Sequence, residues 1–161
     1  MKIRRIDIGD VQEFWQLQKQ LDNETKFMMF EPDERKFNLG RAVGAIARMD
    51  FLIGAEENGK LVGFLSAQCG KPQRIKHQAY IVVGILQEFQ HQGLGQQFFT
   101  QLDEWATTHE IKRLELTTMI TNAPAIALYQ KNGFSIEGVR RQSMQIGGEF
   151  IDEFYMGKIF E

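Results

Sequence analysis

The chain has 161 residues, of which 43% are hydrophobic and 25% are charged, and its formal net charge is −2. A chain of this length buries roughly two-thirds of its unfolded surface, so one core suffices without disulfides or metals. The charge balance lacks the basic excess of a nucleic-acid-binding protein. The single cysteine, Cys69, excludes a disulfide framework and any Cys-x-x-Cys metal or redox site within the chain.

The start of the chain and its apolar runs bear on location. Residues 1–10 alternate charged and aliphatic side chains and lack the apolar core of a signal peptide. No apolar run approaches the roughly 18 residues needed to span a bilayer. We therefore expect a cytoplasmic protein with no membrane or nucleic-acid partner.

Hydrophobic periodicity and turn residues predict a mixture of strands and helices. In chain order we expect a strand at 2–6, helices at 11–21 and 33–48, strands at 51–55, 61–67 and 78–86, a helix at 94–109, a strand at 112–119, a helix at 122–131, and strands at 134–146 and 149–159. Asp10 is a candidate N-cap for the first helix, and Asn58-Gly59 and Gly147-Gly148 are typical hairpin turns. The apolar, aperiodic segment 26–32 ends in a proline and is expected to be a loop. This order predicts an α+β (three-layer α/β) fold, one mixed sheet between helices, in a single domain over residues 1–161.

The most informative segment is Gln90-His91-Gln92-Gly93-Leu94-Gly95, which joins an apolar strand pattern to an amphipathic helix pattern. Closely spaced glycines let consecutive N–H groups turn inward, and the helix start adds unpaired donors and a positive dipole end. Such a junction favours a phosphate or pyrophosphate. A P-loop is excluded because Gly95 precedes Gln96-Gln97, and a dinucleotide-binding fingerprint is excluded because Phe98 stands where a third glycine is needed.

Two motifs in this chain resemble those of the GCN5-related N-acetyltransferases (GNAT). Gln90-x-x-Gly93-x-Gly95 is similar to the family's (Gln/Arg)-x-x-Gly-x-(Gly/Ala) motif, and Asn122-x-x-Ala125-x-x-Leu128-Tyr129-x-Lys131-x-Gly133-Phe134 is similar to its second signature. The C-terminal hairpin resembles, more loosely, that of the amino-acid, ribosomal-protein and polyamine acetylating branches. The resemblance implies a mixed, mostly antiparallel seven-stranded sheet, splayed at a bulged central strand, with helices on both faces.

The same resemblance implies an activity. In the family, a primary amine of a small molecule, polyamine, amino-acid analogue or protein N-terminus attacks the thioester of acetyl-CoA directly within a ternary complex. A non-catalytic acyl-CoA-binding or sensing module on the same fold is the alternative. A homodimer is common in the family, and no metal is implied.

Carried over residue by residue, the family's cofactor site falls on two segments of this chain. The expected pyrophosphate-binding backbone consists of Gln90, His91, Gln92, Gly93, Leu94, Gly95 and Gln96. The pantetheine arm is expected to pair with the strand edge at Val83, Gly84 and Ile85, with the Ile85 N–H as oxyanion donor. Asn122 is expected to bind the cofactor or cap its helix, and Tyr129 matches the acid that protonates the CoA thiolate. Gln90 departs from the commoner arginine, which leaves less positive charge for the pyrophosphate.

The base and the acceptor pocket are less closely determined. Glu88, just past the bulged strand, is the candidate base, and carboxylates of the C-terminal hairpin are alternatives: Glu149, Asp152 and Glu153. The acceptor is expected opposite the cofactor, against the loop after the first helix and the C-terminal aromatics. The residues expected to contact it are Phe27, Met28, Met29, Glu31 and Tyr155. Each of these side chains is otherwise explained as part of the core or the solvated surface.

Overall fold

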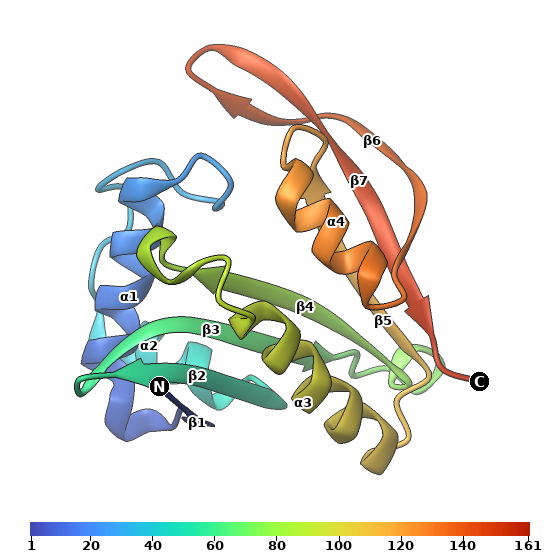
Figure 1. The fold of residues 1–161 in the computed structure, drawn as a ribbon, viewed down its shortest axis with the longest axis horizontal. Helices are drawn as coiled ribbons and strands as arrows, with labels where there is room; N and C mark the ends of the chain where they lie inside the picture. Colours follow the sequence, from blue (N-terminus) through green and yellow to red (C-terminus); the bar gives the residue numbers. More distant parts are fainter.

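The sheet has seven strands in the order β1-β2-β3-β4-β5-β7-β6 in the computed structural model, which describes residues 1–161 (Figure 1). The strands are β1 (Lys2–Arg5), β2 (Phe51–Glu57), β3 (Lys60–Cys69), β4 (Gln78–Ile85), β5 (Arg113–Met119), β6 (Ser135–Ile146) and β7 (Glu149–Ile159). The helices are α1 (Val11–Glu24), α2 (Leu39–Ala47), α3 (Leu94–Thr108) and α4 (Ala123–Lys131), with short 3₁₀ turns η1 (Ile8–Asp10), η2 (Gln73–Ile75) and η3 (Gln87–Phe89). All neighbouring strands are antiparallel except β4 and β5, which are parallel. The predicted α+β fold is confirmed.

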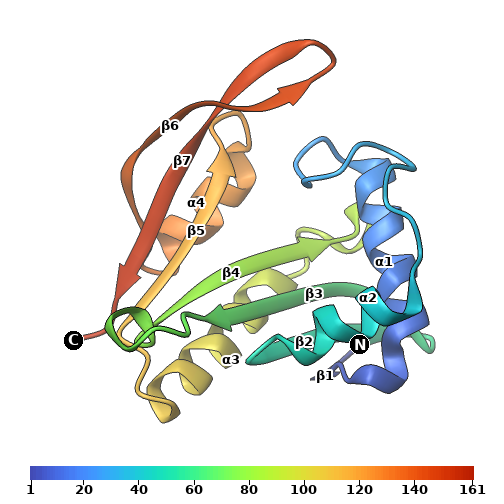
Figure 2. The same cartoon turned by 180° about the vertical axis from the view of Figure 1, so that it is seen from behind.

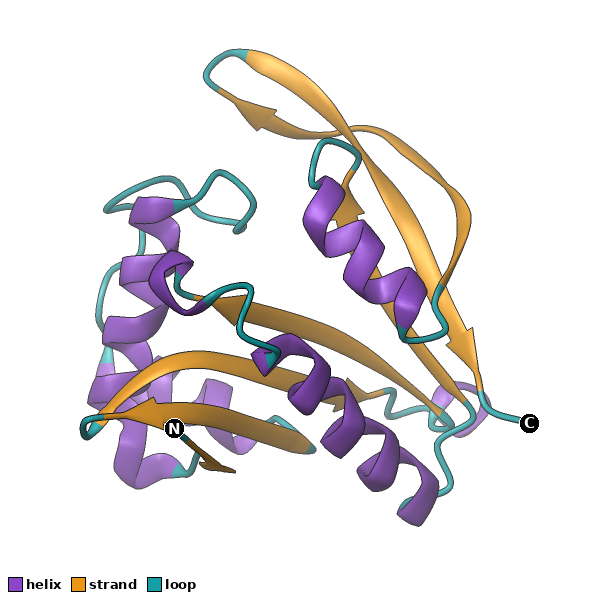
Figure 3. Ribbon diagram, in the orientation of Figure 1, coloured by secondary structure: helices purple, strands orange, loops and turns teal.

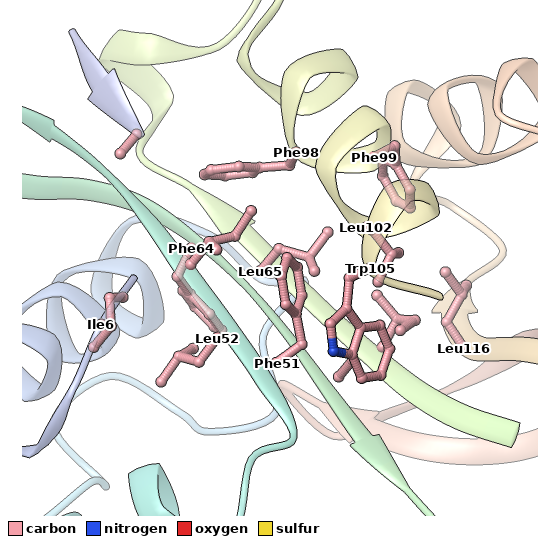
Figure 4. Packing of buried hydrophobic residues seen from close by; sticks show 14 of the residues in the cluster. Ile6, Phe51, Leu52, Phe64, Leu65, Phe98, Phe99, Leu102, Trp105 and Leu116 are labelled. Carbon is pink, nitrogen blue, oxygen red and sulfur yellow. The ribbon is translucent and has the colours of Figure 1, made fainter. Parts of the chain in front are cut away.

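Helices cover both faces of the sheet, α1 and α2 on one and α3 and α4 on the other (Figures 1, 2 and 3). The buried stripe of α3 recurs at helical spacing and consists of Leu94, Phe98, Phe99, Leu102, Trp105 and Ala106. Figure 4 shows Phe98, Leu102 and Trp105 of this stripe over the strands. Trp105 stacks on Phe51 with ring centroids 5.2 Å apart. On the opposite face Phe14 of α1 meets Phe64 of β3 edge to face at 5.1 Å. The core therefore fixes α1 and α3 on either side of β3 and β4.

The sheet splits between β4 and β5. These strands pair only where they begin, from Gln78–Arg113 to Tyr80–Glu115, and then diverge (Figures 1 and 2). Strand β5 instead pairs with β7 along its whole length and so follows the C-terminal hairpin. The register between β3 and β4 runs without a shift, so the expected bulge does not interrupt this ladder. The sheet is therefore splayed by the divergence of β5 from β4, which leaves the edge of β4 beyond Tyr80 without a strand partner.

One predicted helix boundary was wrong, and one predicted cap is confirmed in position only. The second helix begins at Leu39 rather than at residue 33, because Asn38 is its N-cap and accepts the Arg41 N–H at 3.0 Å. Asp10 occupies the predicted N-cap position of α1, but its side chain makes no capping hydrogen bond; the carboxylate instead pairs with Arg4 and accepts the Asp7 N–H. No helix combines the length and apolar character needed to cross a bilayer.

Candidate active site

A cavity of about 780 Å³ opens where β4 and β5 diverge. One wall comes from α1 and the loop after it, and the other from α4 and the start of α3. The ends of β4 and β5 and part of β7 complete the lining. The split in the sheet therefore joins the two faces of the molecule in one recess.

The loop from β4 to α3 presents unpaired backbone donors to this cavity. The N–H groups of residues 91–96 take no part in the backbone hydrogen bonds, and the first α3 amide to do so is Gln97, which donates to Gly93 O at 3.1 Å. His91 and Gly93 have positive φ values of 62° and 82°, which turn the peptide groups inward. Consecutive inward N–H groups at a helix start form an anion site. This backbone is suited to a pyrophosphate, as the sequence predicted.

Gly95 has a different role from Gly93, because it allows α3 to pack closely on α4. A Cβ on Gly95 would lie 2.7 Å from Leu128 Cδ2. The Gln96 side chain donates to Asn132 Oδ1 at 2.9 Å, and Asn132 Nδ2 donates back to Gln96 Oε1 at 3.2 Å. The loop is thus anchored to α4, and Gln96 can offer a ligand its backbone N–H rather than its side chain.

The open edge of β4 offers backbone groups at alternate residues. Leu86 N–H donates to Val62 O, and Gly70 N–H donates to Gln78 O, so the even-numbered residues of β4 bond to β3. Val83 and Ile85 consequently direct their N–H and C=O groups into the split. The backbone N–H and C=O of Gly84 face β3, so Gly84 does not have the expected role of pairing with the pantetheine arm. Glycine is needed there for packing, because a Cβ would lie 2.8 Å from Leu21 Cδ1.

The side chain of Gln90 fixes the end of this edge. Its Nε2 donates to Ile85 O at 3.0 Å. The Ile85 N–H faces the split on the same side of the strand, beyond the point where β5 pairs with β4, and is available to an acceptor in the cavity. Gln92 does not line the cavity, because its Nε2 donates to Glu88 O at 3.2 Å. The loop side chains therefore hold the loop, and its backbone faces the recess.

Tyr129 lines the cavity from α4 and is only 8% exposed. Its ring packs against Phe99 and Phe134 at centroid distances of 5.8 and 6.1 Å. Burial raises the pKa of Tyr129 well above its ordinary value, and the nearby Tyr80 adds to the rise. The phenol therefore stays protonated at neutral pH and can donate a proton or hydrogen bond, but it is unsuited to act as a base.

Asn122 precedes α4 and lines the same cavity. It occupies the N-cap position, yet its side chain makes no capping hydrogen bond, so the capping role weighed from the sequence is not present. Lys131, at the other end of α4, also lines the cavity and adds a cation to this wall. The amide of Asn122 and the ammonium of Lys131 are both placed for a polar, anionic ligand.

The structure separates the candidate bases. Glu88 lies in η3, is exposed and does not line the cavity, so the structure does not bring it to the other site residues. Glu153 of β7 lines the cavity and is only 7% exposed. Its carboxylate accepts the Ser143 hydroxyl at 2.8 Å and lies 3.6 Å from Arg140. Glu153 is therefore the hairpin carboxylate that faces the recess, whereas Glu149 and Asp152 do not line it.

The predicted acceptor residues are only partly brought together. Phe27, Met28 and Met29 line the cavity, whereas Glu31 is exposed outside it. Tyr155 lines a separate recess of about 360 Å³, formed by residues of β4, β5, β6 and β7. The apolar loop is thus placed at the mouth of the site, and the C-terminal tyrosine is not.

Several lining residues were not identified from the sequence. Tyr80 lines both recesses, and its hydroxyl lies 2.8 Å from Thr117 Oγ1. Arg35 lines the cavity from the loop between α1 and α2. A sequence signal for Tyr80 did exist, because it is a hydroxyl-bearing side chain within the otherwise aliphatic strand β4. Arg35 had no such signal, because its position depends on a distant contact with Asp22.

Comparison with known proteins places this geometry in a family. The family model described as the acetyltransferase (GNAT) family matches residues 12–134, a span that holds both motifs. The chain belongs to the GNAT family. It is 29% identical over 106 residues to the L-amino acid N-acetyltransferase AaaT of Escherichia coli (strain K12), an alignment that covers 63% of this chain and 64% of that protein. The chain thus spans less than two-thirds of that relative's length.

Solved structures agree on the fold. A GNAT-family acetyltransferase from Streptococcus pneumoniae superimposes with a TM-score of 0.92 at 28% identity, covering 99% of each chain. The acetyltransferase yncA of Salmonella typhimurium, solved with its cofactor acetyl-CoA, gives a TM-score of 0.86 at 19% identity, covering 100% of this chain and 94% of that one. At such low identity the second likeness shows the fold alone.

Proposed function

We propose that this GNAT protein is an N-acetyltransferase that transfers the acetyl group of acetyl-CoA to a primary amine. The observation that carries the proposal is the single cavity that joins the anion-binding loop, the open edge of β4 and the protonated Tyr129. The AaaT relative and the acetyl-CoA complex of a protein with the same fold support it.

Each part of acetyl-CoA has a matching group in the cavity. The free N–H groups of His91 and of residues 93–96, which line the cavity, suit the pyrophosphate, and Lys131 adds a positive charge. The edge of β4 at Val83 and Ile85 suits the amide groups of the pantetheine arm. The Ile85 N–H is available to stabilise the negative charge that develops on the thioester oxygen. When bound, acetyl-CoA supplies an activated acyl group and a thiolate leaving group.

Protons move at both ends of the reaction. A primary amine that arrives as its ammonium ion must lose a proton before it can attack, and the attacking nitrogen loses another as the amide forms. The buried carboxylate of Glu153 is suited to accept a proton, directly or through water, whereas the other cavity carboxylate, Glu24, already accepts the Gln87 N–H at 2.6 Å. The thiolate must gain a proton as it leaves, and the hydroxyl of Tyr129, which lines the cavity, is suited to hydrogen-bond to the sulfur and donate that proton. The base proposed from the structure therefore lies on the C-terminal hairpin rather than at Glu88.

Release of free thiol from acetyl-CoA tests the proposal directly. The purified protein is incubated with acetyl-CoA and a panel of primary amines, and products are identified by mass spectrometry. Tyr129→Phe keeps the packing against Phe99 and Phe134 but removes the hydroxyl, so we expect kcat to fall about 100-fold.

Tyr155→Phe is the matched control, because this tyrosine lies outside the cavity and its loss should leave the rate unchanged. Saturable binding of acetyl-CoA without turnover on any amine would indicate a binding module instead. Equal rates for Tyr129→Phe and the wild type would contradict the acid role.

A further inference from the structure

The loop between α1 and α2 carries an arginine that is held rigidly at the cavity. Arg35 Nε donates to Asp22 Oδ2 at 2.7 Å, and Arg35 Nη2 donates to Asp22 Oδ1 at 3.2 Å. Asp22 is only 1% exposed, so this is a nearly desolvated bidentate pair. The guanidinium also lies over the Phe30 ring, 4.5 Å from its centroid. These contacts fix the plane of the guanidinium before any ligand binds.

The pairing with Asp22 uses one edge of the guanidinium and leaves another open. Arginine has five N–H donors in a planar fork, and the Nε and Nη2 edge is the one occupied here. Nη1 and the remaining Nη2 hydrogen take no protein acceptor, although the side chain lines the cavity and is 18% exposed. The open edge matches a second carboxylate, with two parallel N–H···O bonds.

If the Arg35–Asp22 pair served only to hold the loop between α1 and α2 against α1, Arg35 would not need to line the cavity. Asn23 and Asp33 already tie this loop to α1, through bonds of 3.1 and 3.3 Å. Arg35 instead keeps free donors beyond its pair with Asp22 and lines the recess, as do the apolar residues Phe27, Met28 and Met29 of the same loop. Buried Glu153 lines the same recess from β7. The recess therefore combines a fixed cation, an apolar surface and a carboxylate.

We infer that Arg35 binds a carboxylate of the acceptor, so that the acceptor is an amino acid with a free carboxylate and an apolar side chain. This inference rests on the proposed acetyl transfer. The carboxylate binds the open edge of Arg35 and the side chain contacts the apolar loop, which leaves the amine free within the same cavity. A polyamine is disfavoured, because a second cation would meet the guanidinium instead of an anion.

Paired acceptors that differ only in charge test this assignment. L-Methionine is compared with L-methioninamide, in which the carboxylate is replaced by a neutral amide. For the wild type we expect kcat/KM to be at least about 10-fold higher for the amino acid, as loss of charge-assisted hydrogen bonds implies. Arg35→Gln should raise KM for L-methionine about 10- to 100-fold with little change in kcat, and should leave the amide within about threefold. Arg41→Gln, an exposed arginine of α2 outside the cavity, is the control.

Arg35→Gln alone strands the buried Asp22 carboxylate and can unfold the protein. The double variant Asp22→Asn/Arg35→Gln removes both charges together and should show the same selective loss toward L-methionine. Equal kcat/KM for the acid and the amide in the wild type would overturn the inference, as would an equal loss for both acceptors in the folded variants. If no amine at all releases thiol from acetyl-CoA, the proposed function itself fails. Turnover of amines without a carboxylate preference refutes only the role of Arg35.

Discussion

Substitution of Gly95 by alanine tests how the anion-binding loop is attached to the rest of the site. The added Cβ would lie 2.7 Å from Leu128 Cδ2, whereas ordinary contacts are 3.4–4 Å, so Leu128 has to move. Overpacking of this kind costs about 1–3 kcal/mol. Alanine is favoured over glycine in a helix by up to about 1 kcal/mol, and Gly95 lies in the first turn of α3. We therefore expect Gly95→Ala to destabilise the wild type by about 1 kcal/mol.

The sign should reverse when Leu128 is shortened. In the Leu128→Ala background the overlapping Cδ2 atom is absent, so only the helix preference of alanine remains. Gly95→Ala should then stabilise the protein by up to about 1 kcal/mol, which gives a coupling energy of about 1–2 kcal/mol in the double-mutant cycle. Urea unfolding of the four proteins, followed by circular dichroism, measures these free energies.

The same cycle has a functional readout. Because the displaced Leu128 side chain strains the contact that holds the start of α3 on α4 in Gly95→Ala, the KM for acetyl-CoA should rise in that variant and recover in part in the double variant. Additive unfolding free energies would refute the reasoning, since they would show that Leu128 rotates away without cost. A stabilising effect of Gly95→Ala in the wild-type background would refute it as well.

Three further substitutions test other parts of the account. Glu153→Gln should lower kcat about 100-fold at neutral pH, whereas Glu149→Gln on the same hairpin should leave thiol release unchanged. Asn122→Ala should change the free energy of unfolding by less than about 0.5 kcal/mol, because its side chain caps nothing, but should raise the KM for acetyl-CoA. Hydrogen bonds from Arg4 hold the pKa of Asp10 below its ordinary 3.8, so Asp10 stabilises the fold above that pH and the stabilisation is lost as the pH falls. The stability difference between the wild type and Asp10→Asn, measured by urea unfolding, should therefore shrink as the pH is lowered below about 4.

Much of the fold follows from local signals. The hairpin turn at Asn58-Gly59 and the apolar stripe of α3 each predicted an element that the structure contains. The start of α2 was misplaced because the segment before Asn38 is held by contacts with α1, such as that between Arg35 and Asp22. Such contacts join residues that no periodic pattern relates.

The site residues likewise fall into those that local motifs predict and those that depend on contacts distant in sequence. The anion-binding loop and Tyr129 lie within short motifs, so the sequence alone predicted their place together. Glu153 reaches the cavity because β5 pairs with β7 and carries the hairpin past the split in the sheet. Tyr80 reaches it because β5 leaves β4 just after that residue. These positions depend on strand order, which single-sequence patterns do not determine.

Amide NMR spectra with and without acetyl-CoA test the central claim most directly. We propose that the backbone N–H groups of His91 and of residues 93–96 bind the pyrophosphate and that the N–H groups of Val83 and Ile85 bind the pantetheine arm and the thioester. On titration with acetyl-CoA alone, we predict that these amide signals shift together and become protected from hydrogen exchange. Saturation with acetyl-CoA that leaves the signals of residues 91–96 unchanged would contradict the account.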